Sequence, residues 1–140
     1  MIFSVTTLRD TPRNVEKFVR RNLAGGVDHM IVFLDGEQPE VAALLEANPY
    51  VTPVTTDDAW WGADRPAPLN VRQLTNAEVA RRVLRTLEGA RWLFHIDGDE
   101  VLRLDRDVLD AIEPRWQVVA LATLEAVGGM HPEGDPTWFK

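Results

Sequence analysis

The sequence predicts an α/β fold, a three-layer αβα sandwich with a mostly parallel sheet. Short apolar runs alternate along the chain with segments of helical periodicity, which is the order of strands joined by crossover helices. The run His29–Leu34 is apolar almost throughout, as in a strand buried on both faces. The chain has 140 residues, of which 45% are hydrophobic and 26% charged, and this is the composition of one soluble domain.

The first part of the chain supplies three expected strands and two expected helices. The strands are 2–7, 29–34 and 50–54. We place the third near a sheet edge because Pro53 cannot donate a ladder hydrogen bond. The first helix begins at Thr11-Pro12, a hydroxyl cap followed by proline, and ends at Gly25-Gly26. The second begins at Pro39 and runs through Ala47.

The second part begins with an aperiodic segment, 57–68, which we expect to be a loop. The longest helical pattern follows over 69–88, with Leu74 among the residues of its apolar stripe. The remaining expected elements are a strand at 91–96, a short helix that is capped by Asp105 and ends before Pro114, and a fifth strand at 117–124. His95 alternates with core residues on its strand and is expected to be a buried histidine. We expect the fold to continue past the irregular tail or to be completed by a partner.

Composition excludes several classes of function. The chain has no cysteine, so disulfide scaffolds, cysteine-ligated zinc and thiol catalysis are excluded. The net charge of −7 argues against binding to nucleic acid or to an anionic membrane. No apolar run approaches the ~18 residues of a membrane span, and the N-terminus lacks the pattern of a signal peptide. We therefore expect a cytoplasmic protein without an integral membrane segment.

Acidic residues follow three of the expected strands. Their positions are Asp35-Gly36, Asp57-Asp58 and Asp97-Gly98-Asp99-Glu100. Ligands of open α/β sheets bind at the carboxyl ends of the strands, and carboxylate oxygens are ligands of hard divalent cations. Glycine at 98 would let the backbone turn tightly between two carboxylates. The sequence is consistent with a cation site at this edge, and equally with a solvated acidic turn.

A second candidate group lies in the first turns of the long helix. Arg72, Gln73 and Asn76 have the spacing of one helix face, and their side chains suit recognition of phosphates and base edges. The alternative is an ordinary solvated face. Trp60 and Trp61, in the loop before this helix, either stack on a base or sugar or serve as lid or core aromatics.

Three stretches together resemble family 2-like glycosyltransferases of the GT-A fold. They are NLAGGVDHMIVF at 22–33, Arg72-Gln73 with Asn76, and WLFHIDGDEVL at 92–102. Their order and spacing agree with the family over roughly residues 1–125. The resemblance implies that residues 1–140 form a nucleotide-sugar-binding domain, incomplete at its C-terminus.

The resemblance also implies a function and a site. The chain would transfer a sugar from a UDP- or GDP-linked donor to an unknown acceptor, with Mn or Mg bound directly by Asp99, and with Asp97 near the ribose or sugar or bound to the metal through water. Thr6 would line the nucleotide beside Thr7. The positions assigned to the nucleotide-sugar site are Thr7, Arg9, Asp35, Asp57, Asp58, Arg72, Gln73, Asn76, Asp97, Gly98 and Asp99.

Two departures from the family keep alternatives open. Leu8-Arg9-Asp10-Thr11 stands where the family has Lys-Asn-Glu, and the later part of the family's fold, which supplies the catalytic base of inverting members, is absent or reduced to the tail. Glu125, Glu133 and Asp135 are candidates for the base by position alone. The alternative to an active transferase is a non-catalytic nucleotide-sugar-binding module or a fragment of a longer transferase. An uncovered sheet edge leaves a homodimer open.

The sequence disfavours a second enzymatic function, that of a phosphatase. LFHIDGDEVL also looks like the aspartyl nucleophile motif of haloacid-dehalogenase-type phosphatases, but here it follows the fourth strand. That chemistry needs a downstream lysine, and the only one is the terminal Lys140.

Overall fold

A computed structural model describes residues 1–113 and 115–124. The chain divides into two compact units, one over Met1–Arg106 and a second that begins at Asp107. The first unit is an α/β domain with a single sheet, which confirms the predicted class. No helix within the described ranges is long and apolar enough to cross a lipid bilayer.

The sheet has four strands in the order β3-β2-β1-β4, and every neighbouring pair is parallel. The strands are β1 (Ile2–Leu8), β2 (His29–Leu34), β3 (Val51–Thr55) and β4 (Trp92–His95). All seven residues of β1 are buried, since this strand has a neighbour on each side and helices above and below. β3, which carries Pro53, is an outer strand as predicted.

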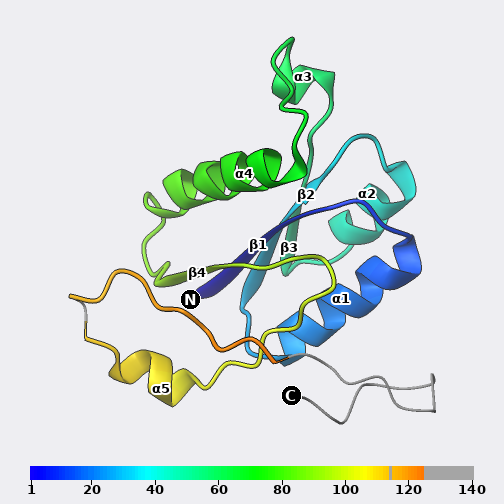
Figure 1. Cartoon of the computed structure of the whole chain (residues 1–140). Helices are drawn as coiled ribbons and strands as arrows, with labels where there is room; N and C mark the ends of the chain where they lie inside the picture. Colours follow the sequence, from blue (N-terminus) through cyan, green and yellow to red (C-terminus); the bar gives the residue numbers. More distant parts are fainter. Residues whose placement is uncertain (114, 125–140) are drawn as a thin grey trace. The chain divides into compact units, whose positions relative to one another are not determined.

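Helices cover both faces of the sheet. Figure 1 shows α1 (Pro12–Ala24) and α2 (Pro39–Glu46) on one side and α4 (Leu69–Leu84) on the other. The short helix α3 (Asp58–Trp61) stands out beyond the sheet, between β3 and α4. A last helix, α5 (Arg106–Ala111), follows at the boundary between the units.

The chain order creates a switch point between β1 and β4. From β1 the chain passes through α1 to β2 and through α2 to β3, moving outward in one direction. It then returns through α4, on the opposite face, to place β4 on the other side of β1. In sheets of this kind, ligands bind in the crevice outside the carboxyl ends of the two strands that flank the switch point.

The core lies on both faces of β1 and β2. On the α4 side, Ala80 packs with Val5 and Phe33, and its small side chain lets the helix approach the sheet. On the other side, α1 and α2 bury Val15 and Leu45, each almost completely inaccessible. Apolar burial on two faces accounts for the nearly continuous apolar sequence of β2.

The structure differs from the predictions at several elements. Residues 117–124 form no strand, although the run is rich in β-branched and apolar residues, and Val118 is 84% exposed. Strand propensity expresses itself only where a ladder partner is available. The long helix ends at Leu84 rather than at Glu88, and the segment expected to be a loop contains α3.

Burial predictions were wrong on α4 and on β4. Leu74 is 63% exposed, because it lies on the face of α4 opposite the sheet. His95 is exposed rather than buried, because β4 is an outer strand and the helices cover its last residue incompletely.

Candidate functional site

The candidate site lies at the carboxyl ends of β1 and β4, where the switch point occurs. The ladder pairs Val5 with His95, and Ile96 N donates to Val5 O at 3.1 Å, so the register continues beyond β4. Two residues on, Asp97 comes level with Thr7. Thr6 is also buried, but successive strand residues face opposite sides of the sheet, so it lies on the α1 side.

Two amide side chains of α4 reach this point. Asn76 is fully buried, and its Nδ2 donates to Thr7 Oγ1 at 2.9 Å. Gln73, one turn earlier, donates through Nε2 to Asp97 Oδ1 at 3.0 Å. The structure therefore brings together four of the predicted site residues. Asn76 Oδ1 is buried and has no hydrogen-bond partner among the described residues. This oxygen is therefore available to accept a hydrogen bond next to the four residues.

The acidic residues after β4 form a closed turn. Glu100 N donates to Asp97 O at 3.1 Å, and Asp97 N donates back to Glu100 Oε2 at 2.9 Å. The Glu100 carboxylate is thus used inside the turn. Asp99 is exposed, and its carboxylate accepts no hydrogen bond from any residue in the described ranges.

Glycine is needed at position 98 for a different reason from the one predicted. Gly98 does not adopt a positive φ, so the turn itself does not require glycine. A Cβ at this position would lie 3.3 Å from Leu8 Cβ, which is closer than side chains ordinarily pack. Gly98 therefore allows the acidic turn to lie against the last residue of β1.

Asp35, after β2, is held by two guanidinium groups. Arg72 forms a bidentate ion pair with Asp35: its Nε donates to Oδ1 at 3.0 Å and its Nη2 donates to Oδ2 at 2.8 Å. Arg65 Nη2 donates to Oδ1 at 2.8 Å. Burial alone would raise the pKa of Asp35, but the hydrogen bonds from Arg72 and Arg65 outweigh it and hold the pKa below its usual value.

Arg72 also organises the segment before α4. Its Nη1 donates to the carbonyls of Pro66 and Ala67 at 2.8 and 2.7 Å. Both partners of the Asp35–Arg72 pair are largely buried, each with 11% of its side chain exposed. The side chain predicted to bind a phosphate thus ties the chain before α4 to the end of β2.

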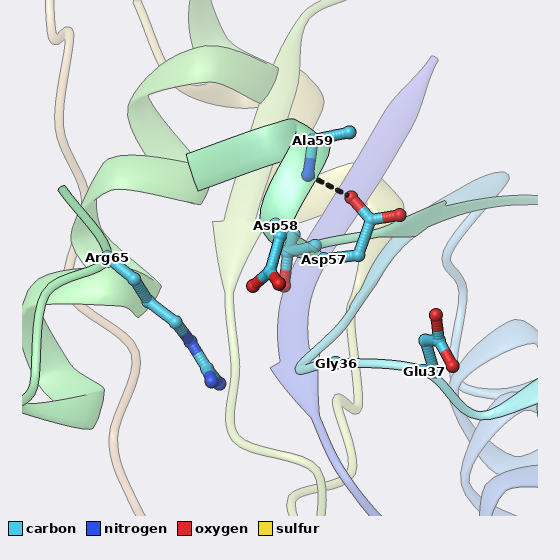
Figure 2. A pocket seen from close by; sticks show the side chains of 7 residues that line it. Gly36, Glu37, Asp57, Asp58, Ala59 and Arg65 are labelled. Atoms are coloured by element: carbon cyan, nitrogen blue, oxygen red, sulfur yellow. Dashed lines mark hydrogen bonds between the residues drawn. The ribbon is translucent and has the colours of Figure 1, made fainter. Parts of the chain in front are cut away.

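A pocket of about 230 Å³ opens over the ends of β2 and β3. It is lined by Gly36, Glu37, Thr56, Asp57, Asp58, Ala59 and Arg65. Figure 2 shows Arg65 and Glu37 on opposite sides of the hollow, with Asp58 between them. Asp57 caps α3, because its Oδ1 accepts hydrogen bonds from Ala59 N at 3.0 Å and Trp60 N at 3.1 Å.

The two adjacent tryptophans attach α3 to the sheet. The rings of Trp60 and Phe33 are tilted against each other with centroids 5.6 Å apart, and Trp61 meets Trp60 edge-on at 6.3 Å. Trp60 still exposes 36% of its surface. It therefore packs on a core residue while keeping a part of its ring accessible at the rim.

Arg9 is the cation of the β1 end. It is exposed, and its Nη1 lies 4.0 Å from the position that a Cβ on Gly36 would take. Across the described ranges its guanidinium forms neither an ion pair nor a hydrogen bond. A guanidinium without a partner in the described residues therefore lies near Gly36, at the same edge of the sheet.

The described residues contain no group of three or more carboxylate or imidazole side chains placed to hold a metal ion. Asp97 and Asp99 offer two carboxylates, the donor type that Mg²⁺ and Mn²⁺ prefer when phosphates supply further oxygens. Glu125, Glu133 and Asp135, the positional candidates for a base, lie outside the described residues.

Sequence reasoning missed two residues with structural roles at this edge. Arg65 lies in an aperiodic segment, where no spacing indicates its contact with Asp35. Gln38 donates to Leu8 O at 3.1 Å and accepts from Asp10 N at 3.1 Å, joining the ends of β1 and β2. Comparison with family models, curated proteins and solved structures finds no match to this chain.

Proposed function

We propose that this chain binds a nucleotide-sugar donor together with a divalent cation, as a metal-dependent glycosyltransferase of the family 2-like GT-A type or as the donor-binding part of one. One observation carries the proposal. Asp97, held by Gln73, lies level with the Thr7–Asn76 pair at the switch point of a parallel sheet, and the free Asp99 carboxylate follows two residues later. Open α/β sheets bind ligands outside the carboxyl ends of the two strands that flank such a switch point.

The two aspartates fit the proposed cation. Asp97 uses one oxygen to accept the Gln73 amide, and Asp99 is exposed and uncommitted to hydrogen bonds within the described chain. A divalent cation bound there would neutralise charge on the diphosphate as the nucleoside diphosphate leaves the sugar. The chain's own contribution is to fix the first carboxylate and to leave the second available.

Other residues at the same edge of the sheet could bind the phosphates and the nucleoside of the donor. Arg9 offers a free guanidinium for a phosphate, a pairing that is bidentate and charge-assisted. The carboxylates of Asp57 and Asp58 line the pocket over β2 and β3, where they accept hydrogen bonds from the hydroxyl or ring N–H groups of a nucleoside. UDP and GDP both present such donors.

Calorimetric titration tests the proposal. UDP and GDP are each titrated into the parent, with and without Mn²⁺, and then into Asp99→Asn and the control Glu46→Gln, which removes a charge at the far end of α2. We expect one nucleotide to bind only with Mn²⁺, binding to be lost in Asp99→Asn, and the control to bind as the parent does. Binding of neither nucleotide to the parent would refute the proposal.

A further test separates catalysis from binding. If the chain binds the nucleotide with Mn²⁺, the corresponding nucleotide sugar is incubated with it and release of free nucleoside diphosphate is followed. Release marks a transferase or hydrolase activity of this chain alone. Binding without release assigns the chain as a nucleotide-sugar-binding module.

A further inference from the structure

Asn22 contacts the acidic turn from the side of the sheet opposite Gln73. It lies in α1, on the opposite face from α4, and it is fully buried. Its Nδ2 donates to Glu100 O at 3.1 Å and to Phe18 O at 3.0 Å, and its Oδ1 accepts from Leu102 N at 2.8 Å. One side chain thus satisfies backbone groups on both sides of Val101, about 80 residues away along the chain.

The backbone beside Asn22 fits against the same segment. A Cβ on Gly25 would lie 1.9 Å from Leu102 O, so only glycine leaves room for this carbonyl. Leu104 N donates to Gly25 O at 2.9 Å. The chain that leaves the acidic turn is therefore held along the C-terminal end of α1 by three hydrogen bonds and by a close steric fit.

The acidic turn is consequently fixed at both ends and from both faces of the sheet. At its beginning, Gln73 of α4 holds the side chain of Asp97. At its end, Asn22 of α1 holds the backbone of Glu100 and Leu102. Asp99, between these anchors, is exposed, and its carboxylate accepts no hydrogen bond within the described residues. We propose that Asn22 is a positioning residue, which sets the place of Asp97 and Asp99 at the carboxyl ends of β1 and β4 without touching the ligand.

The ligand part of this inference rests on the proposed function, whereas the positioning part does not. A purely structural role for Asn22 would affect the whole domain. A positioning role affects the acidic turn and the affinity for a cation complex, while the remaining sheet keeps its order. Two measurements on the full chain therefore separate the roles: Mn²⁺-dependent nucleotide affinity, and amide hydrogen exchange resolved by residue.

The variant is Asn22→Leu, which keeps the number of side-chain heavy atoms and removes all three hydrogen bonds without changing charge. The matched control is Val15→Ala, which removes buried packing atoms from the same helix and touches no group of the turn. Asn22→Asp is the second variant, for use if Asn22→Leu does not fold. It keeps an acceptor for Leu102 N and loses the donor to Glu100 O.

We expect the affinity for Mn²⁺ with UDP or GDP to fall at least about tenfold in the Asn22 variant and less than about twofold in Val15→Ala. We also expect the amides of Asp97, Glu100 and Leu102 to exchange at least about tenfold faster in the Asn22 variant, relative to the amides of β1. Parent-like exchange at the turn, or parent-like affinity in the Asn22 variant, would overturn the inference.

Failure of the proposed function gives a different result. In that case the parent itself binds neither nucleotide with Mn²⁺. Exchange at the turn then decides the positioning role alone: faster exchange confined to the turn supports it, and unchanged exchange or exchange that rises equally in β1 refutes it.

Discussion

Gln73 Nε2 donates to Asp97 Oδ1 across 3.0 Å and so joins the second turn of α4 to the acidic turn after β4. The two residues are 24 positions apart in sequence. The contact orients one carboxylate oxygen of Asp97 by a neutral donor, which leaves the charge of the carboxylate uncompensated. If Asp97 binds a cation as proposed, this hydrogen bond orients its carboxylate, and the neutral donor adds no positive charge that would repel the cation.

Gln73→Ala is expected to weaken Mn²⁺-dependent nucleotide binding roughly threefold to tenfold, because Asp97 then loses its orienting donor. The free energy of unfolding is expected to change by less than about 1 kcal/mol, since the hydrogen bond is exposed. Titration calorimetry and urea unfolding measure the two effects. The control is Thr75→Ala, which removes an exposed hydroxyl of the same helix whose hydrogen bond within the described residues is to Val71 O. Equal affinity in Gln73→Ala and the parent would contradict this role.

Arg9→Ala is expected to lower the affinity for UDP or GDP with Mn²⁺ by about tenfold, through loss of a charge-assisted phosphate contact. Its stability should stay within about 0.5 kcal/mol of the parent, because the exposed side chain has no partner in the described structure. Arg20→Ala, an exposed arginine later in α1, removes the same charge away from the strand ends. If both variants lose affinity equally, the effect is general electrostatics and the contact is disproved.

Asp35→Asn is expected to destabilise the fold by roughly 2–4 kcal/mol at pH 7, because two guanidinium groups lose their buried anionic partner. The pKa of Asp35 is lower in the folded state than its usual 3.8. A depressed carboxyl pKa adds stability above the unfolded value, and this stability disappears as the pH falls through the folded value. The difference in the free energy of unfolding between parent and variant should therefore be constant near neutrality. It should shrink as the pH falls below 3.8.

Urea unfolding of the parent and Asp35→Asn at a series of pH values checks this expectation. Other carboxyls with lowered pKa values, such as those of Asp10 and Asp28, are common to both proteins and cancel in the difference. A gap that stays the same down to about pH 2.5 would show that the ion pair is not its source.

Gly25→Ala is expected to destabilise the domain by about 1–3 kcal/mol, because the new methyl group forces the Leu102 carbonyl away. The comparison is Gly89→Ala, at a positive φ of 84° with open space around the position, where only backbone strain is introduced. Thermal unfolding measures both. Amide exchange at Leu104, whose N–H bonds Gly25 O, should rise in Gly25→Ala and stay unchanged in Gly89→Ala.

The layered architecture was predictable because its signals are local. The expected boundaries 29–34 coincide with those of β2, since a short run that is apolar on both faces is typical of a covered parallel strand. Parallel order then puts the residues after each strand at one edge, so Asp35, Asp57 and Asp97 were correctly predicted to share it.

The pairings within the site could not be predicted in the same way. The contacts of Asn22 with Glu100 and of Arg65 with Asp35 join segments that are far apart in the chain. They depend on how closely these segments pack, and the spacing of residues in the sequence does not indicate this. The strand predicted at 117–124 failed for a related reason, because a strand exists only with a hydrogen-bonding partner. His95 was misjudged because alternation along a strand does not show whether that strand is central or outer.

Pro53 has a consequence for how other chains can meet this sheet. Thr56 N donates to Leu34 O, and main-chain groups alternate in direction along a strand, so the nitrogens of Val51, Pro53 and Thr55 face away from β2. Proline has no hydrogen to donate, and Val51 N is already bonded to Asn48 O. Among the described residues, only Thr55 keeps an unbonded main-chain donor on that margin of β3. Two of the three outward nitrogens therefore cannot donate to a further strand, which weakens this margin as a template for intermolecular strand addition.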